Sequence, residues 1–252
     1  MMFWFKKDTI HIDCFVSNAT VYNNFKIDQA SKYYPDDIKT YPKKIEVKAS
    51  QDPDSILVSS IPTIKMCNGI TDLFSNGFIL PAWHQFSIEM TNQGNCVVSS
   101  AGSHFQAIMI ENHPRIQYGN ELYKGYSHAK LVSPWLVKEK SGVKFTWNMC
   151  DWHKTENAQN VRILSAVVDY KYQVYTNVNM FIRNGSVISY DAGDPLAHMI
   201  PISDKRVKLH HHLIDVEDWH RMRTEYELHS SYPNHRKLKY NERKCPFGFG
   251  KK

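Results

Sequence analysis

Short runs in which apolar and polar residues alternate are the feature that most limits the fold of this sequence. Phe86, Ile88 and Met90 alternate with polar residues across positions 85–91. Such alternation places every second side chain on one face, as in a strand that is buried on one side. Further strand candidates lie at residues 9–16, 96–99, 129–132, 143–149, 161–172, 178–183 and 187–190.

Turn signals separate these runs at short spacing, and no amphipathic helix lies between them. Asn184-Gly185 stands between two of the runs and predicts a β-hairpin, and Gly193-Asp194-Pro195 predicts a second turn. This arrangement predicts an all-β fold, an antiparallel β-sandwich that resembles a jelly roll. We assign residues 1–214 to the sandwich domain and expect an irregular excursion at residues 19–55, which show few helix or strand signals.

Two helices are expected. Ile70, Leu73 and Phe74 form one apolar face of a short helix, and Gly77 is placed to end it in the left-handed conformation. A longer C-terminal helix begins after Asp215 and carries an apolar stripe that we expect to pack on the outside of the sandwich. The stripe consists of Val216, Trp219, Met222 and Tyr226.

The composition bears on the size of the core and on the cellular compartment. Hydrophobic residues make up 42% of its 252 residues, which is enough for a substantial core. The five cysteines are widely spread and never form a CxxC pair, which is typical of reduced thiols in a cytosolic protein. The apolar run at the N-terminus stops after Phe5, and no stretch is long enough for a spanning helix, so we expect neither secretion nor a membrane partner.

The net charge of +6 is confined to the end of the chain. Residues 1–204 contain 19 basic and 19 acidic residues, whereas residues 205–252 contain 12 and 6. A basic tail that carries aromatic residues can contact the phosphates and bases of a nucleic acid. The alternative is a solvated tail that packs its aromatic residues on the body. The candidate nucleic-acid contacts are Arg236, Lys237, Lys239, Tyr240, Arg243 and Lys244.

Three of the thirteen histidines form a candidate metal site. On a strand, His210 and His212 would point to the same face, and His198 could supply a third ligand for Fe, Zn or Mn. With Glu217, the pair resembles the first half of the cupin metal motif, but the flanking glycines of that motif are missing. The alternative is that these are surface histidines beside Lys205, Arg206 and Lys208. His11-Ile12-Asp13 has the H-x-D spacing of non-haem iron enzymes, but it falls on the first predicted strand.

Several standard catalytic motifs are absent. The sequence contains no G-x-S-x-G nucleophile elbow and no G-x-x-x-x-G-K-[ST] phosphate loop. The tryptophans are expected in the core or at its rim, where some of them could line a groove for a small ligand or a peptide. They are Trp83, Trp135, Trp147, Trp152 and Trp219.

Residues 63–81 resemble the signature T-[IV]-K-x-C-P…G-[YF]-I-[IL]-P of an uncharacterised protein family of tailed bacteriophages, notably those of marine cyanobacteria. Residues 130–135, 193–202 and 244–247 are similar to later landmarks of that family, whereas Asn68 stands where the family has proline. The resemblance implies a viral origin and a place in the host cytoplasm or the virion, but it implies no activity. Residues 192–198 also resemble a turn of jelly-roll dUTPases, although the other nucleotide-binding motifs of that family are missing.

These observations favour a non-catalytic phage accessory or virion-associated protein that acts by binding an unidentified ligand. Its partner would be a phage structural protein or a nucleic acid. Two alternatives stay open at this point. One is a cupin-like metal-dependent oxygenase that uses His198, His210 and His212, and the other is a nucleic-acid-binding protein that uses the basic tail.

Overall fold

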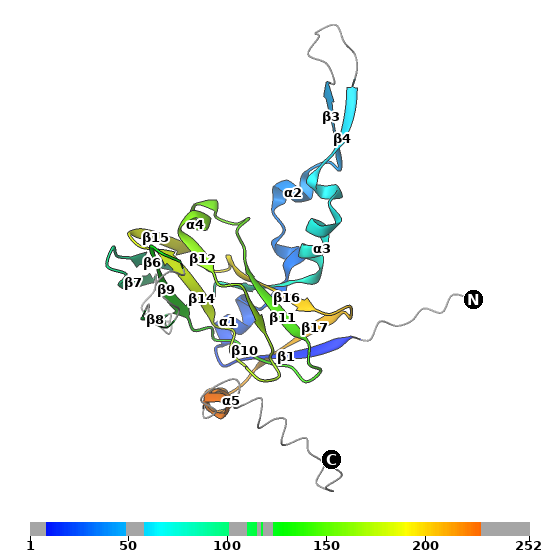
Figure 1. Ribbon diagram of the computed structural model, residues 1–252. Coiled ribbons are helices and arrows are strands. Elements are labelled where there is room, and N and C mark those ends of the chain that lie inside the picture. The colour runs from blue at the N-terminus through cyan, green and yellow to red at the C-terminus, as the bar shows by residue number, and fades with distance from the viewer. Residues whose placement is uncertain (1–8, 49–57, 101–109, 115–116, 118–122, 228–252) are drawn as a thin grey trace, which may run out of the picture.

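Four β-sheets surround the main hydrophobic core in the computed structural model, which describes residues 9–48, 58–100, 110–114, 117 and 123–227 (Figure 1). Strands supply most of the ordered elements, and all pairings but one between named strands are antiparallel. The predicted all-β class is therefore confirmed.

The first sheet has the order β10-β1-β17 and contains the exception. Its strands are β10 (Leu136–Lys138), β1 (Ile10–Val16) and β17 (Val207–Leu213). β1 and β17 run parallel, with Asp13 opposite His210 and Phe15 opposite His212. Parallel neighbours need a long connection, and here almost the whole chain separates the two strands.

The second sheet has the order β13-β11-β16-β5-β2 and is antiparallel throughout. Its strands are β13 (Ala166–Val168), β11 (Lys144–Met149), β16 (Pro195–Ile202), β5 (Phe78–Pro81) and β2 (Asp28–Gln29). All four residues of β5 are buried, because both of its faces are covered. Phe78 and Leu80 face the main core, whereas Ile79 faces a second apolar cluster around Phe74.

The hairpin predicted at Asn184-Gly185 is not formed, because its two strands belong to different sheets, the third and the fourth. The third contains β12 (Val161–Ile163), β14 (Val178–Arg183), β9 (Tyr126–Leu131) and β8 (Ile110–His113), and the fourth contains β15 (Ser186–Tyr190), β6 (Phe86–Met90) and β7 (Cys96–Ser100). Asn184-Gly185 makes the expected tight turn, with Gly185 at φ 75°. The strands on either side do not pair, because β14 bonds to β9 and β12 whereas β15 bonds to β6. The turn therefore carries the chain from one sheet to another.

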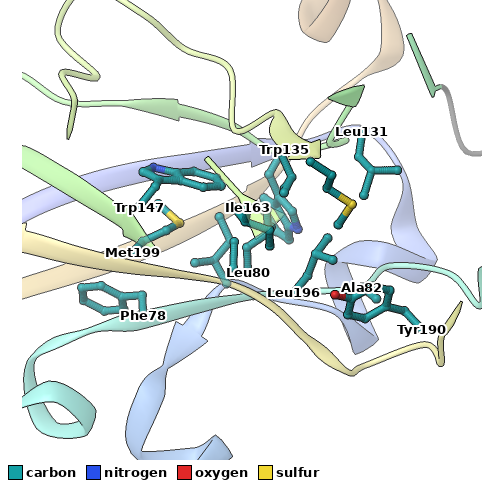
Figure 2. Close-up of a cluster of buried hydrophobic side chains, with 14 of the residues drawn as sticks. Phe78, Leu80, Ala82, Leu131, Trp135, Trp147, Ile163, Tyr190, Leu196 and Met199 are labelled. Atoms are coloured by element: carbon teal, nitrogen blue, oxygen red, sulfur yellow. The ribbon is translucent and has the colours of Figure 1, made fainter. Parts of the chain in front are cut away.

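Side chains from all four sheets meet in the main core. Figure 2 shows members from the second, third and fourth sheets. Trp147 of β11 lies opposite Met199 of β16 in the register of the second sheet, and Leu131 enters from the third. Trp135 is fully buried and donates its indole N–H to the carbonyl of Phe25 at 3.0 Å. This bond satisfies the one polar atom of the indole, as burial requires.

Residues 19–48, expected to be irregular, contain short ordered elements. They are α1 (Ala19–Asn24), β2, the 3-10 turn η1 (Ala30–Tyr33), α2 (Asp36–Thr40) and β3 (Lys44–Lys48). The chain returns through β4 (Val58–Pro62), the 3-10 turn η2 (Ile64–Met66) and α3 (Asn68–Asn76). We call residues 36–48 and 58–67 the arm, because they project from the sheets with the β3–β4 hairpin outermost (Figure 1).

Gly77 follows α3 as predicted, but its conformation was predicted wrongly. Its φ of −107° and ψ of 172° are extended, not left-handed. The chain runs directly from α3 into β5, so no left-handed reversal is needed. A Cβ at this position would lie 2.6 Å from Cδ2 of His198 and closer still to Nε2. The structure therefore requires glycine for close packing rather than for a positive φ.

The predicted C-terminal helix is confirmed as α5 (Val216–Glu227), and a further short helix, α4 (Thr155–Asn160), precedes β12. Trp219 and Met222 pack against a small cluster around Leu136 and Val174. The Trp219 indole also donates to the carbonyl of Pro134 at 3.0 Å. In the described part of the chain, no helix combines the length and apolar character needed to cross a membrane.

Candidate binding surface

His210 and His212 lie on the same side of β17, as the two-residue period predicts. The parallel strand β1 places two further groups beside them. Nε2 of His210 lies 2.7 Å from Nδ1 of His11, and Nε2 of His212 lies 2.8 Å from Oδ1 of Asp13. The H-x-D tripeptide on the first strand thus meets the histidine run near the C-terminus.

These four groups form two separate pairs. Nε2 of His210 is engaged with His11, whereas Nε2 of His212 is engaged with Asp13. In the His11–His210 pair one imidazole must donate and the other accept, so the contact needs at least one neutral ring. The Asp13–His212 pair is more than two-fifths exposed on each side, which makes its contribution to stability small.

His198 does not join them. It lies on β16 in the second sheet, is 1% exposed, and faces Gly77 and the ring of Phe74, whose centroid is 6.3 Å away. Nε2 of His198 has no hydrogen-bond partner, and burial lowers the pKa of the imidazole to about 4. The side chain is therefore a neutral, packed core group.

The predicted three-histidine metal site is thus not assembled. Among residues 9–48, 58–100, 110–114, 117 and 123–227, no group of three or more His, Cys, Asp or Glu side chains is arranged to hold a metal ion. Glu217 lies in the first turn of α5. His198 is turned toward α3 while His210 and His212 lie on β17, so the cupin-like arrangement of Fe, Zn or Mn ligands does not fit the geometry.

The basic tail lies outside the described residues, so its role stays a prediction. This applies to Arg236, Lys237, Lys239, Tyr240, Arg243 and Lys244.

The tryptophans occupy the expected core and rim positions. Trp135 and Trp147 are buried in the main core. Trp83, Trp152 and Trp219 are partly exposed at the edges of apolar clusters. Trp83 and Trp219 line the same cleft between the sheets and α5.

The arm carries an exposed apolar surface that the sequence patterns did not predict. Four large apolar side chains on it remain about half exposed, at 43–49%. They are Tyr41, Ile61, Ile64 and Met66. Tyr41 and Ile64, together with Ile38, Ile45 and Thr63, line a shallow groove of about 420 Å³.

Hydrogen bonds between the two halves of the arm hold this surface in shape. The hydroxyl of Thr63 donates to the carbonyl of Pro42 at 2.6 Å, and the ammonium of Lys65 donates to the carbonyl of Lys39 at 2.6 Å. β3 and β4 form a two-stranded sheet with each other. The apolar residues are therefore presented on a defined framework.

A weak sequence signal for this surface does exist. Ile45 and Val47 alternate with charged residues, and two further apolar residues, Ile61 and Ile64, come after Ser59-Ser60. The elements are too short for a clear period, and residues 49–57 separate the two strands. Only the pairing of β3 with β4 brings the apolar side chains together.

No family model and no curated protein matches the chain. A search of solved structures returned the D95N mutant of the dUTPase from phage phi11 of S. aureus. It is 11% identical, with 40% of this chain and 95% of that chain covered, at a TM-score of 0.25. A TM-score this low supports no conclusion about the fold or the function of this chain.

Proposed function

We propose that this chain is a non-catalytic accessory protein of a tailed bacteriophage, virion-associated or acting in the host cytoplasm, that binds a protein partner through its arm. The single observation that carries the proposal is the half-exposed apolar surface on the projecting arm. The phage setting is supported by the sequence resemblance over residues 63–81 and later landmarks.

The exposed apolar area favours a partner that covers it. A two-stranded hairpin is marginally stable on its own in water, and β3 and β4 pair only with each other among the described strands. Burying a large apolar side chain completely contributes about 1.5–3 kcal/mol. Covering the exposed half of four such side chains would contribute roughly 3–6 kcal/mol before the cost of association.

The charges around the surface favour an acidic partner. The arm contains five lysines against Asp36, Asp37 and Glu46. Lys43 and Lys44 are exposed, whereas Lys39 is paired with Asp36 at 3.0 Å. An apolar centre with a basic rim is complementary to an apolar patch bordered by carboxylates, and such complementarity speeds association and selects the partner.

Site-specific photo-crosslinking tests the location of the binding surface. A photoreactive phenylalanine replaces Ile64 in one protein and Val167 in another, and each is expressed in the infected host. Val167 is 61% exposed on the edge strand β13 and serves as the matched exposed apolar control. We expect a discrete crosslinked product with one protein at position 64 and none at position 167. Equal products at both positions, or none at position 64, would contradict the proposal.

A further inference from the structure

Among the described strands, β17 lies at one edge of the first sheet and pairs only with β1. The N–H of Ile10 donates to the carbonyl of Arg206 at 2.8 Å, and with the strand register this bond assigns the main-chain groups of the even-numbered residues to β1. The N–H and C=O groups of Val207, Leu209 and His211 therefore point away from β1. Within the described part of the chain, these main-chain groups make no hydrogen bond at the edge. Such an edge is a template for pairing with another strand.

A groove of about 540 Å³ lies beside this edge. Its opposite wall includes residues of β2, which is the edge strand of the second sheet, and of η1. The imidazole of His211 donates to the carbonyl of Ile27 at 2.9 Å and joins the two walls at that point. On the β2 side, the N–H of Gln29 is satisfied by the side chain of Asp28 at 2.8 Å. The β17 side of the groove therefore offers the unpaired main-chain donors.

The two faces of β17 differ in character beside the groove. Val207 and Leu209 lie on the face that packs against the main core. Arg206 and Lys208 lie on the opposite face and are exposed, as the two-residue period of a strand requires. The edge is thus apolar on one face and basic on the other.

The basic face carries positive charge that is not neutralised by ion pairs. The one carboxylate in the lining, that of Asp28, is ion-paired with Lys32 at 2.5 Å. Asp204 precedes Arg206 by two residues but does not line this groove. Among the described residues, neither Arg206 nor Lys208 forms an ion pair. These two cations therefore favour acidic side chains on a partner.

These features favour an extended protein segment over other occupants. The side chains of an added strand alternate between the two faces, so apolar ones would lie beside Val207 and Leu209, and acidic ones beside Arg206 and Lys208. Residues 1–8 of this chain match poorly, because they carry two lysines against one aspartate. A second copy of β17 also matches poorly, since it would place like charges beside each other.

We propose that the free edge of β17 binds an extended segment of a partner protein in which acidic and apolar residues alternate. The segment adds a fourth strand to the first sheet. Because the groove shares no lining residue with the arm, this binding is independent of the function proposed for the arm.

A fluorescein-labelled peptide of alternating glutamate and valine is the probe, and fluorescence anisotropy measures its affinity for the full-length protein. We expect the double variant Arg206→Gln and Lys208→Gln to weaken binding by about tenfold. A peptide with glutamine in place of glutamate should bind the variant and the wild type within about twofold of each other. The control variant Lys144→Gln and Arg183→Gln replaces two exposed cations on strands outside the groove and should leave the affinity within about twofold.

Methylation of the peptide nitrogens tests the main-chain pairing. A strand pairs with a neighbour through the main-chain groups of every second residue. Methylating either all glutamates or all valines therefore removes the donors along one edge of the peptide only. We expect one of these two peptides to lose at least tenfold in affinity and the other to stay within about threefold. Equal affinities of the two methylated peptides would overturn pairing with β17.

Three further outcomes would also overturn the proposal. The first is an unchanged affinity of the glutamate peptide in the double variant Arg206→Gln and Lys208→Gln. The second is a loss of binding in Ile64→Ser, which would place the peptide on the arm. The third is tighter binding of a fluorescein-labelled ten-nucleotide oligothymidylate than of the peptide, with the same dependence on Arg206 and Lys208, which would assign the groove to nucleic acid.

Discussion

Replacing Gly77 by alanine tests how tightly α3 and β5 close over His198. The backbone at Gly77 is extended, so alanine can adopt it without strain. Alanine reduces the conformational entropy of the unfolded chain. This effect alone would raise the free energy of unfolding by about 0.4–1 kcal/mol. The new methyl group, however, would overlap the ring of His198, with Cδ2 at 2.6 Å.

The overlap cannot be relieved cheaply, because His198 is 1% exposed and the ring of Phe74 lies beside it. Overpacking of a well-packed site costs about 1–3 kcal/mol. We therefore expect Gly77→Ala to lower the free energy of unfolding by about 1–2 kcal/mol after the gain from the unfolded chain is subtracted. Urea unfolding followed by tryptophan fluorescence measures this change.

A double-mutant cycle with His198→Ala tests whether the destabilisation by Gly77→Ala comes from overlap of the new methyl group with the His198 ring. His198→Ala removes the ring and is itself destabilising, because it leaves a cavity. In that background, Gly77→Ala should be neutral or stabilising by up to about 1 kcal/mol, which corresponds to a coupling of about 2 kcal/mol. If Gly77→Ala costs the same with and without the imidazole, the packing argument is wrong.

Two further predictions concern the titratable groups of His198 and Asp194. Burial lowers the pKa of His198 to about 4 from 6.5, so below pH 6.5 the unfolded chain binds a proton that the folded chain does not. Stability should therefore fall by about 3 kcal/mol as the pH drops from 6.5 to 4. Urea unfolding at a series of pH values measures this change. In His198→Leu the free energy of unfolding should depend less steeply on pH, and an unchanged pH dependence would show that His198 is not the group responsible. Asp194 accepts from the ammonium of Lys154 at 2.7 Å and lies 3.2 Å from Nε2 of His153. Its pKa is lowered chiefly by its bond to Lys154, against the opposing effect of burial. Asp194→Asn should destabilise the protein by about 1–2 kcal/mol at pH 7, measured by thermal unfolding. The difference should begin to shrink below about pH 3.9, where the carboxyl of the unfolded chain takes up a proton, and it should be lost once the folded carboxyl is also protonated below its lowered pKa. A constant difference would contradict the ion-pair account.

Local patterns in the sequence were sufficient to predict individual strands. The alternation of Phe86, Ile88 and Met90 predicts β6 and its buried face, and both are observed. The apolar spacing of Ile70, Leu73 and Phe74 likewise predicts α3. In these segments the period of the side chains matches the period of the backbone, so no distant contact is needed to recognise them.

Long-range pairing could not be predicted from those patterns. The turn at Asn184-Gly185 is local, but the pairing of β15 with β6 depends on residues about a hundred positions away. The contacts of His210 with His11 and of His212 with Asp13 each join residues 199 positions apart. A histidine pattern on one strand shows which face it occupies but not which strand lies beside it.

Binding of a protein through the arm is best tested by measuring the affinity of the partner. The partner identified by crosslinking at position 64 is purified, and its dissociation constant is measured by calorimetry for the wild type, Ile64→Ser and Val167→Ser. Ile64 and Val167 are both about half exposed, at 49% and 61%, so each substitution should lower the free energy of unfolding by a similar amount, about 1 kcal/mol. We predict that Ile64→Ser weakens binding by about tenfold, whereas Val167→Ser leaves it unchanged. Equal affinities of the wild type and Ile64→Ser would contradict binding through the arm.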